Sequence, residues 1–315
     1  MEMRPLGRSG IRVAPLAFGG NVFGWTADEA TSFRLLDTFV DAGFNLIDTA
    51  DVYSSWAEGN KGGESETIIG RWLAKTRKRG RVVIATKVGY DRKAEGKGLG
   101  RIHILRSVEG SLARLRTDHI DLYQSHVEDP GTAHEESLAA YAELIEAGKV
   151  RAIGASNFKP GTLRDALAVS ARLGLPRYET LQPLYNLCDR EGFEAELGPL
   201  CREEGLGVIP YFALASGFLT GKYRQEADLA ASPRGQRAKN YLNERGLRIL
   251  AALDEVAAGL GATPGRVAIA WLMAQPGITA PIASGRSVEQ VTELVAAARL
   301  ELDAAAMVRL ARASA

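Results

Sequence analysis

Apolar residues along the chain gather in short runs rich in Val, Ile and Leu, and longer amphipathic stretches separate these runs. Several of the short runs are apolar at nearly every position, which is typical of parallel strands buried on both faces. The pattern predicts strands at Pro15–Gly19, Phe44–Asp48, Val82–Lys87, Ile120–His126, Val150–Ala155, Thr180–Pro183, Gly207–Tyr211 and Ile278–Ala283.

The amphipathic stretches between these strands repeat their apolar positions with the period of a helix. They predict helices at Asp28–Ala42, Glu64–Arg79, Leu105–Arg116, Glu135–Ala147, Thr162–Leu173, Phe193–Glu204, Arg266–Ala274 and Val288–Ala298. At the first helix, Thr26 and Glu29 have the spacing of a capping box. Glycines follow five of the helices at the place where a left-handed C-cap is favoured, namely Gly43, Gly80, Gly148, Gly174 and Gly205.

Strands that alternate with helices in this way predict an α/β fold, a closed (β/α)8 or TIM barrel. The gap between the seventh and eighth strands is wider than the others, which indicates an insertion with a polar loop at Gly221–Arg245 and an extra helix near Leu247–Leu260. Ahead of the barrel, Met3–Arg12 resembles a short hairpin that turns at Gly7–Gly10. Because no Pro- or Ser-rich linker divides the chain, we expect residues 1–315 to form one barrel domain.

A doubly wound sheet is the main alternative fold. Its dinucleotide-binding motif, G-x-G-x-x-G, would lie between a strand and the next helix. The nearest match, at Gly259–Gly265, has the wrong spacing and joins two predicted helices. The sequence therefore favours the barrel.

Charge and cysteine content narrow the classes of function. Lys and Arg number 39 against 38 acidic residues, and this balance gives no general attraction to nucleic acid or to an anionic membrane. The first residues contain no apolar signal segment, and no run reaches the length of a membrane span. Cys188 and Cys201 lack the spacing of a metal site, so we interpret them as free thiols of a reducing compartment, with a disulfide as the alternative. We expect a cytoplasmic protein that binds neither nucleic acid nor membranes.

Three consecutive predicted strands end in an ionisable residue, Asp48, Lys87 and His126, and Tyr53 follows Asp48 in the next loop. Each alone has an ordinary structural explanation, but barrel active sites lie at the carboxyl ends of the strands, where these residues would meet. A buried lysine needs a partner such as Asp48. Its ammonium would lower the pKa of the Tyr53 hydroxyl, whose usual value is about 10. The set suits a reaction that builds negative charge on oxygen and then protonates it.

Longer segments carry a family resemblance that spans nearly the whole chain in order. They are FNLIDTADVYS, VVIATK, SVEGSLARLRTDHIDLYQSH, VRAIGASNF, LQPLYN, FLTGKY and PIASGRSVEQV. In these segments the chain resembles the aldo-keto reductase superfamily. The resemblance implies an NAD(P)H-dependent carbonyl reductase in which Tyr53 donates the proton, Lys87 lowers its pKa, Asp48 holds the lysine and His126 orients the carbonyl.

The resemblance also implies an NADPH molecule extended across the barrel mouth, with NADH as an alternative. Ser156, Asn157 and Gln182 would bind the carboxamide, and Tyr211 would stack on the nicotinamide. The other implied cofactor-binding residues are Gly20, Asn21, Val22, Asp48, Leu214, Gly217, Leu219, Gly221, Lys222, Ser284, Gly285, Arg286, Gln290 and Glu293. Ser284–Arg286 would bind the 2′-phosphate, and Gly then Arg at a strand-to-helix turn is by itself a favourable anion site.

The sequence departs from the family pattern in two places near the expected substrate. After the seventh strand the family usually reads Y-S-P-L-A, whereas this chain has Phe212 and Ala213 in place of the Ser and Pro. The loop after Tyr53 is longer than the common form. We expect Phe23, Trp25 and Trp56 to line the substrate pocket.

Three other functions are compatible with parts of the sequence. An aldose or alcohol dehydrogenase would run the same chemistry in the oxidative direction with NAD(P)+. A nucleotide-binding regulatory subunit is a second alternative, since some relatives of the family serve as channel-associated subunits. A metallo-hydrolase would need several His at strand ends, and among His103, His119, His126 and His134 only His126 ends one, so we expect no metal. We expect a small carbonyl compound as the partner and leave a homo-oligomer open.

Overall fold

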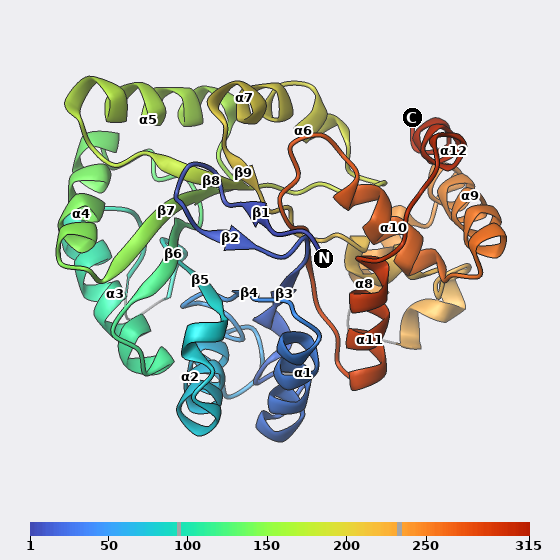
Figure 1. Ribbon diagram of the computed structural model, residues 1–315, viewed down its shortest axis with the longest axis horizontal. Helices are drawn as coiled ribbons and strands as arrows, with labels where there is room; N and C mark the ends of the chain where they lie inside the picture. The colour runs from blue at the N-terminus through green and yellow to red at the C-terminus, as the bar shows by residue number, and fades with distance from the viewer. Residues whose placement is uncertain (93–95, 232–234) are drawn as a thin grey trace.

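A computed structural model describes residues 1–92, 96–231 and 235–315 of the protein. In this part of the chain, parallel strands surround a central axis in sequence order (Figure 1). They are β3 (Ala17–Gly19), β4 (Leu46–Asp48), β5 (Val83–Val88), β6 (Ile120–Ser125), β7 (Val150–Ser156), β8 (Tyr178–Gln182), β9 (Gly207–Val208) and β10 (Ile282–Ala283). The amide of Thr279 donates to the carbonyl of Val208 (2.8 Å) and that of Ile282 to Pro210 (2.8 Å), which joins the last strand to β9. The predicted (β/α)8 barrel is confirmed.

Helices surround the strands on the outside of the barrel (Figure 1). They are α1 (Glu29–Asp41), α2 (Glu64–Thr76), α3 (Arg101–Leu115), α4 (His134–Glu146), α5 (Pro160–Leu173), α6 (Glu191–Glu194), α7 (Leu197–Glu204), α10 (Pro264–Met273) and α11 (Val288–Ala297). Most predicted helices are present with small differences at their ends; the third, for example, begins at Arg101 rather than Leu105. The predicted helix Phe193–Glu204 is instead divided into α6 and α7.

Two separate apolar clusters explain why the site lies at one end of the barrel. One fills the barrel interior with side chains such as Leu46, Leu122 and Ile209. Leu6 and Ile11 belong to the same cluster and come from the predicted amino-terminal hairpin, an antiparallel pair of β1 (Arg4–Pro5) and β2 (Arg12–Val13). The second cluster packs the strands against the helices. Because apolar residues fill the interior and the hairpin, polar groups gather at the carboxyl end.

The predicted insertion between β9 and β10 is also confirmed. Short helical segments occupy it, namely η4 (Ala215–Thr220), η5 (Glu226–Ala231), α8 (Gly235–Ala238) and η6 (Lys239–Tyr241), followed by the predicted extra helix α9 (Glu244–Leu260). Residues 232–234 of the predicted polar loop lie outside the described residues. A further helix that the sequence pattern did not predict, α12 (Ala304–Ala313), packs against α9. Asp303 caps it by accepting from the amide of Ala306 (2.7 Å).

Several predicted element ends are wrong in detail. Asp28, not Thr26, caps the first helix, because its carboxylate accepts from the amide of Thr31 (2.8 Å). Gly80 is not a C-cap: α2 ends earlier, and Arg77 takes the left-handed conformation there (φ 56°). Gly174 and Gly205 are left-handed C-caps as predicted. The last two strands are shorter than predicted.

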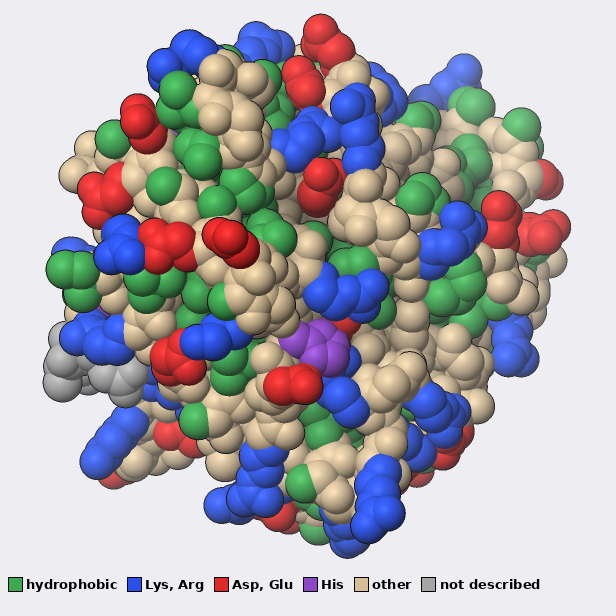
Figure 2. Space-filling view, turned by 60° about the vertical axis from the view of Figure 1, so that its left-hand side comes forward, with side chains coloured by type: hydrophobic (Ala, Val, Ile, Leu, Met, Phe, Trp, Pro, Cys, Tyr) green, Lys and Arg blue, Asp and Glu red, His purple; other side chains and the backbone are tan. Residues whose placement is uncertain are grey.

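Surface charge and helix hydropathy agree with a balanced composition. Acidic and basic side chains are interspersed on the face shown in Figure 2. Across residues 1–92, 96–231 and 235–315, no single helix is long and apolar enough to cross a membrane; α9 and α10 pass such a test only as a pair bent by 95°.

Candidate active site

Lys87 is the centre of a polar group at the carboxyl ends of β4 and β5. Its side chain is fully buried, and its three ammonium protons each have an acceptor. Nζ donates to Asp48 Oδ2 (2.7 Å), to the carbonyl of Thr49 (2.8 Å) and to Tyr53 Oη (2.9 Å). These bonds offset the cost of burying the charge. The predicted contacts among Asp48, Tyr53 and Lys87 are present.

Asp48 holds this group together from the neighbouring strand. Its Oδ2 also accepts a hydrogen bond from Tyr53 Oη (3.1 Å). Its Oδ1 accepts from the amide nitrogens of Gln182 (2.9 Å) and Gln124 (3.4 Å). Both carboxylate oxygens are therefore satisfied although the side chain is buried, and the orientation of Asp48 is fixed.

The surroundings move the pKa of Tyr53 in the direction opposite to the one expected from the sequence. Burial raises the pKa of its hydroxyl well above 10, and the charge of Asp48 and the hydrogen bond to it add to the rise. Burial lowers the pKa of Lys87, while Asp48 opposes that change. The expectation left out the carboxylate, which offsets the ammonium beside the same hydroxyl. Tyr53 consequently keeps its proton at neutral pH, as a proton donor must.

His126 lies directly after β6, and its amide donates to the carbonyl of Val88 (2.8 Å). Its ring meets the rings of Tyr90 and Tyr53 edge to face, at centroid distances of 4.4 and 6.0 Å. Burial and then the charge of Lys87 lower the pKa of the imidazole well below its usual value. A neutral imidazole keeps one N–H, which can donate to a carbonyl oxygen.

A hydrogen-bonded row of side chains continues from His126 along the ends of β7 and β8. The Asn157 amide nitrogen donates to the carbonyl of His126 (3.0 Å), and its Oδ1 accepts from the Tyr211 hydroxyl (2.7 Å). Ser156 Oγ donates to the carbonyl of Gln182 (3.0 Å). Asn157 holds a left-handed backbone conformation (φ 57°), a strained setting that often accompanies a functional site.

A cavity of about 950 Å³ connects this row with the turn after β10. Most of the residues predicted to bind cofactor or substrate line it. They are Asn21, Trp25, Asp48, Tyr53, Trp56, His126, Ser156, Asn157, Gln182, Tyr211, Leu214, Gly217, Lys222, Ser284, Arg286, Gln290 and Glu293.

The other predicted residues are not among those that line the cavity. Val22 and Phe23 are fully buried in the outer apolar cluster, where the Phe23 ring stacks on Phe18 at 5.4 Å. The turn η1 (Gly20–Val22) points these two side chains toward the core. Gly20, Leu219, Gly221 and Gly285 likewise do not line the cavity.

The far end of the cavity is a turn at the start of α11. Ser284 Oγ donates to the carbonyl of Gly19 (2.8 Å), and the Arg286 amide donates to Gln290 Oε1 (2.8 Å). The half-buried guanidinium of Arg286 forms no ion pair with any residue that the structure describes. Glu293 instead pairs with Arg266 and accepts from the Thr263 hydroxyl (3.0 Å).

Sequence reasoning missed several residues that line or support this site. Gln124 follows the alternation Leu122, Gln124, His126 along β6, and that period of two could have placed it beside Asp48. Tyr90 and Arg237 also line the cavity. Arg237 belongs to the insertion, lies near the Phe212 ring at 6.0 Å and had no comparable signal in the sequence.

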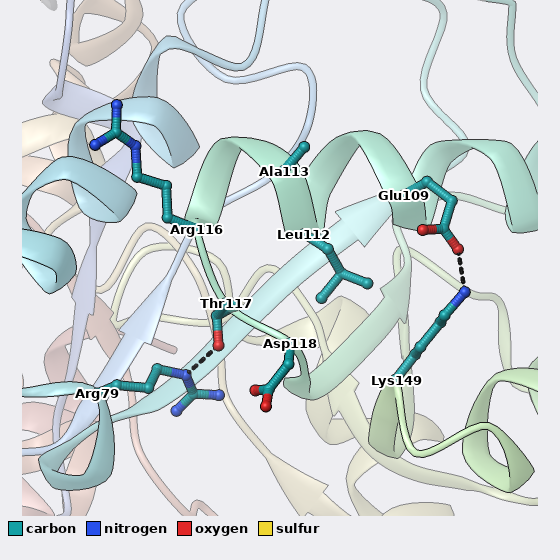
Figure 3. A pocket seen from close by; sticks show the side chains of 8 residues that line it. All are labelled: Arg79, Glu109, Leu112, Ala113, Arg116, Thr117, Asp118 and Lys149. Carbon is teal, nitrogen blue, oxygen red and sulfur yellow. Dashed lines mark hydrogen bonds and ion pairs between the residues drawn. The ribbon is translucent and has the colours of Figure 1, made fainter.

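A second, open basin of about 780 Å³ lies apart from this site (Figure 3). It is lined by residues that precede β5, β6 and β7 and is therefore at the amino end of the barrel. Lys149 pairs with Glu109, and the Arg79 guanidinium donates to the Thr117 hydroxyl (2.9 Å). These polar groups satisfy one another, and nothing in the basin points to a ligand.

The cysteines and the acidic residues show no arrangement for metal or disulfide chemistry in the part of the chain that the structure describes. Within the described ranges, no three His, Cys, Asp or Glu side chains are grouped to hold a metal ion. Cys188 and Cys201 are both free and buried, which excludes the disulfide alternative. Burial raises the pKa of each thiol to about 12.

Comparison with known proteins agrees with the fold and the arrangement of the site. The model of the Aldo/keto reductase family matches residues 15–315. The chain is 37% identical over 310 residues to an uncharacterized oxidoreductase, YrpG, of Bacillus subtilis, covering 96% of this chain and 93% of that one. It is 33% identical to the aldo-keto reductase YhdN of the same organism, covering 93% and 88%. It is also 33% identical to a probable voltage-gated potassium channel subunit beta of rice, Oryza sativa, covering 93% and 90%.

A barrel with these polar groups at its carboxyl end, and with relatives named as oxidoreductases, defines an oxidoreductase class of protein. The chain belongs to the aldo/keto reductase family.

Proposed function

We propose that the protein is an NADPH-dependent reductase of small carbonyl compounds and that it works as a single barrel domain. The observation that carries this proposal is the Tyr53 hydroxyl, held between Lys87 and Asp48 at the wall of a large cavity. That hydroxyl keeps its proton, and neutral His126 lies beside it. A protonated phenol next to a neutral imidazole suits the protonation of a developing alkoxide.

The shape and charge of the cavity fit an extended dinucleotide. Its volume lies at the upper end of the range of cofactor pockets, and it runs from the Tyr211 ring to the α11 turn. At that turn Arg286 has no ion partner among the described residues and stands near the amino end of a helix, both of which favour a phosphate. Lys222 supplies a second cation in the lining of the same cavity.

When bound, NADPH supplies the hydride. His126 can donate its N–H to the carbonyl oxygen of the substrate and so fix which face of the carbonyl is presented. Tyr53 gives its proton to the oxygen as negative charge builds there. Lys87 then stabilises the phenolate that remains, and Asp48, held by Gln182, keeps Lys87 in place.

Aromatic side chains form the walls of the substrate end. Trp25 and Trp56 meet edge to face at 5.8 Å, and Trp56 meets Tyr53 at 5.9 Å. Tyr90 and Phe212 add further aromatic surface. Such a pocket suits an uncharged carbonyl compound with an apolar body. The two free cysteines support a reducing setting such as the cytoplasm, and the balanced charge gives no general attraction to nucleic acid or membranes.

A screen of aldehydes and ketones with NADPH, following the loss of absorbance of the reduced cofactor, tests this function. We expect turnover with wild-type protein and little with Tyr53→Phe. Tight NADPH binding without turnover of any carbonyl compound would contradict the proposal. That result would favour a nucleotide-binding regulatory role, a possibility raised by the rice relative that is named as a channel subunit. Faster oxidation of alcohols with NADP+ would instead favour the dehydrogenase direction.

A further inference from the structure

A second buried group of charged residues lies behind Lys87, on the outer side of β5. Adjacent residues of a strand point to opposite faces, so Thr86 faces away from Lys87. Its hydroxyl donates to Glu66 Oε1 (2.6 Å), and Arg114 Nε donates to Glu66 Oε2 (2.7 Å). Glu66 belongs to α2 and Arg114 to α3, so the charged layer lies between the barrel and two of its helices.

Asp51 is the unusual member of this layer. It is almost fully buried in the loop between β4 and Tyr53, and its amide donates to the carbonyl of Lys87 (3.3 Å). Neither carboxylate oxygen has a well-formed hydrogen bond among the described residues, although the backbone N–H of Val52 approaches the carboxylate, and the buried Tyr123 hydroxyl on β6 also lacks a partner. Asp48, three positions earlier, has partners at both oxygens. Burying an ionised carboxylate without such partners is costly, so a feature of this kind requires an explanation.

Charged and titratable groups face Asp51 from each element packed around it. They are Lys87 of β5, Glu66 of α2, Arg92 of the loop after β5, Arg114 of α3, Tyr123 of β6 and Tyr141 of α4. Burial raises the pKa of Asp51 to about 7, and the charge of Glu66 adds to the rise, while Arg92, Arg114 and the backbone N–H of Val52 oppose it. The carboxyl group therefore changes its charge close to neutral pH.

The charge of Asp51 reaches the catalytic group through Lys87. The three ammonium protons of Lys87 are taken by Asp48, Thr49 and Tyr53, so Asp51 acts on the lysine through space. We propose that Asp51 is a positioning residue for the reaction, whose buried carboxyl group sets the charge behind Lys87 according to whether it holds a proton. This role rests on the reductase function proposed above.

The direction of the effect follows from the sign of the charge. When Asp51 is ionised, it offsets part of the positive potential with which Lys87 stabilises the phenolate of Tyr53. When Asp51 is protonated, that offset disappears and proton donation by Tyr53 becomes easier. One unit charge acting over several ångströms changes the rate by about three- to tenfold.

Single-turnover rates test this effect on the chemical step. Enzyme loaded with NADPH is mixed with saturating aldehyde over about pH 5 to 9, a range that brackets the expected titration. The variant is Asp51→Asn, and the matched control is Asp165→Asn, at an exposed position of α5. For wild type and control, we expect the rate to fall with a midpoint near pH 7, and for Asp51→Asn we expect that step to vanish. An unchanged step in Asp51→Asn would overturn the role.

Isotope-edited NMR provides a readout that does not depend on turnover. We expect one Asp carboxyl resonance of the wild type to titrate near pH 7 and to be missing in Asp51→Asn. The Nζ resonance of Lys87 should shift with the same midpoint in the wild type only. A chemical shift of Lys87 Nζ that does not change with this titration would overturn the proposal even if the enzyme is active. If no carbonyl compound is turned over, the proposed function fails, and the NMR titration still decides the protonation of Asp51.

Discussion

At the scale of single residues, the site depends on one hydroxyl that contacts two neighbours of opposite charge. Lys87 and Asp48 both contact Tyr53 Oη, at 2.9 and 3.1 Å. Burial and then the carboxylate of Asp48 raise the pKa of the Tyr53 hydroxyl, and the ammonium can stabilise the phenolate once the proton has left. The same pair therefore keeps Tyr53 protonated before the reaction and lowers the barrier during it.

Removal of the Tyr53 hydroxyl should stop the chemical step and spare the cofactor. We expect Tyr53→Phe to lower kcat by about 100-fold or more, because the hydroxyl that gives the proton is removed, and to leave the Kd for NADPH unchanged. Lys87→Met should lower kcat to a similar extent, since the phenolate would lose its counter-charge. Stopped-flow turnover and fluorescence titration measure the two quantities. Near wild-type turnover of Tyr53→Phe would exclude it as the proton donor.

Arg286 should set the choice between the two nicotinamide cofactors. A charged hydrogen bond to a phosphate is worth about 1.5–3 kcal/mol, which is roughly ten- to two-hundred-fold in affinity. We expect a preference for NADPH that shrinks by that factor in Arg286→Ala, while NADH affinity barely changes. High salt should weaken the preference, because the turn lies at the rim. Equal wild-type Kd values for NADPH and NADH would show that Arg286 does not recognise the 2′-phosphate.

At the scale of elements, the loop between Tyr53 and α2 joins the catalytic group to the substrate wall. Ser54 Oγ donates to the carbonyl of Phe23 (2.6 Å), and the Asn60 side chain donates to the carbonyls of Gly24 (2.8 Å) and Ser54 (3.1 Å). These bonds fix the loop to the first barrel turn. Trp56, half exposed, is held over the cavity as a result.

Trp56 should select substrates by size. We expect Trp56→Ala to change KM by different factors for bulky and small aldehydes, because an aromatic wall contacts only substrates that reach it. Steady-state kinetics with a graded series of aldehydes provide the measurement. Equal effects on every substrate together with a lower Tm would indicate instead that Trp56 anchors the loop.

The elements also show how far the sequence could predict the site. Asp48, Lys87 and His126 were predictable because parallel strands place their carboxyl ends side by side, so a residue that ends a buried strand has a known place. Phe23 was not, since a short turn decides which way its side chain points. The pKa of Tyr53 also needed the structure, because it depends on the burial of the hydroxyl and on its contact with Asp48. The helix α12 was missed although its apolar positions lie on one side, because it follows the last strand and stands outside the alternation of strands and helices that guided the prediction.

At the scale of the whole molecule, stability and activity depend on opposite ends of the barrel. Leu6 of the hairpin is fully buried in the interior cluster, far from the carboxyl ends. We expect Leu6→Ala to lower the free energy of unfolding by about 2–5 kcal/mol, the usual cost of such a cavity. Chemical denaturation measures this loss, and KM and kcat of the folded fraction should stay within about twofold. A large change in KM would show that the two ends are coupled.

The titration of Asp51 should also appear in global stability. Its pKa in the folded protein, about 7, lies above its ordinary value of 3.8, so the folded state keeps a proton that the unfolded state loses. Stability is then highest below pH 4 with respect to this group and is lost as the pH rises to 7. Asp51→Asn cannot lose that proton. Its free energy of unfolding relative to wild type should therefore increase across this range by a few kcal/mol at most. A constant difference would contradict a buried, titrating Asp51.

The pairing of β10 with β3 has a consequence for how each molecule is made. Ala17 lies beside Ile282, and the hydroxyl of Ser284 reaches back to Gly19, so residues from the two ends of the chain form one seam. During synthesis the amino-terminal part of the chain leaves the ribosome first, so β3 emerges long before β10, its second neighbouring strand, has been made. The proposed phosphate-binding turn, Ser284–Arg286, lies on this seam, so it forms only when β10 pairs with β3 and closes the barrel. Ribosome-bound chains that end before β10 should therefore fail to bind NADPH, even where the catalytic strands are already complete.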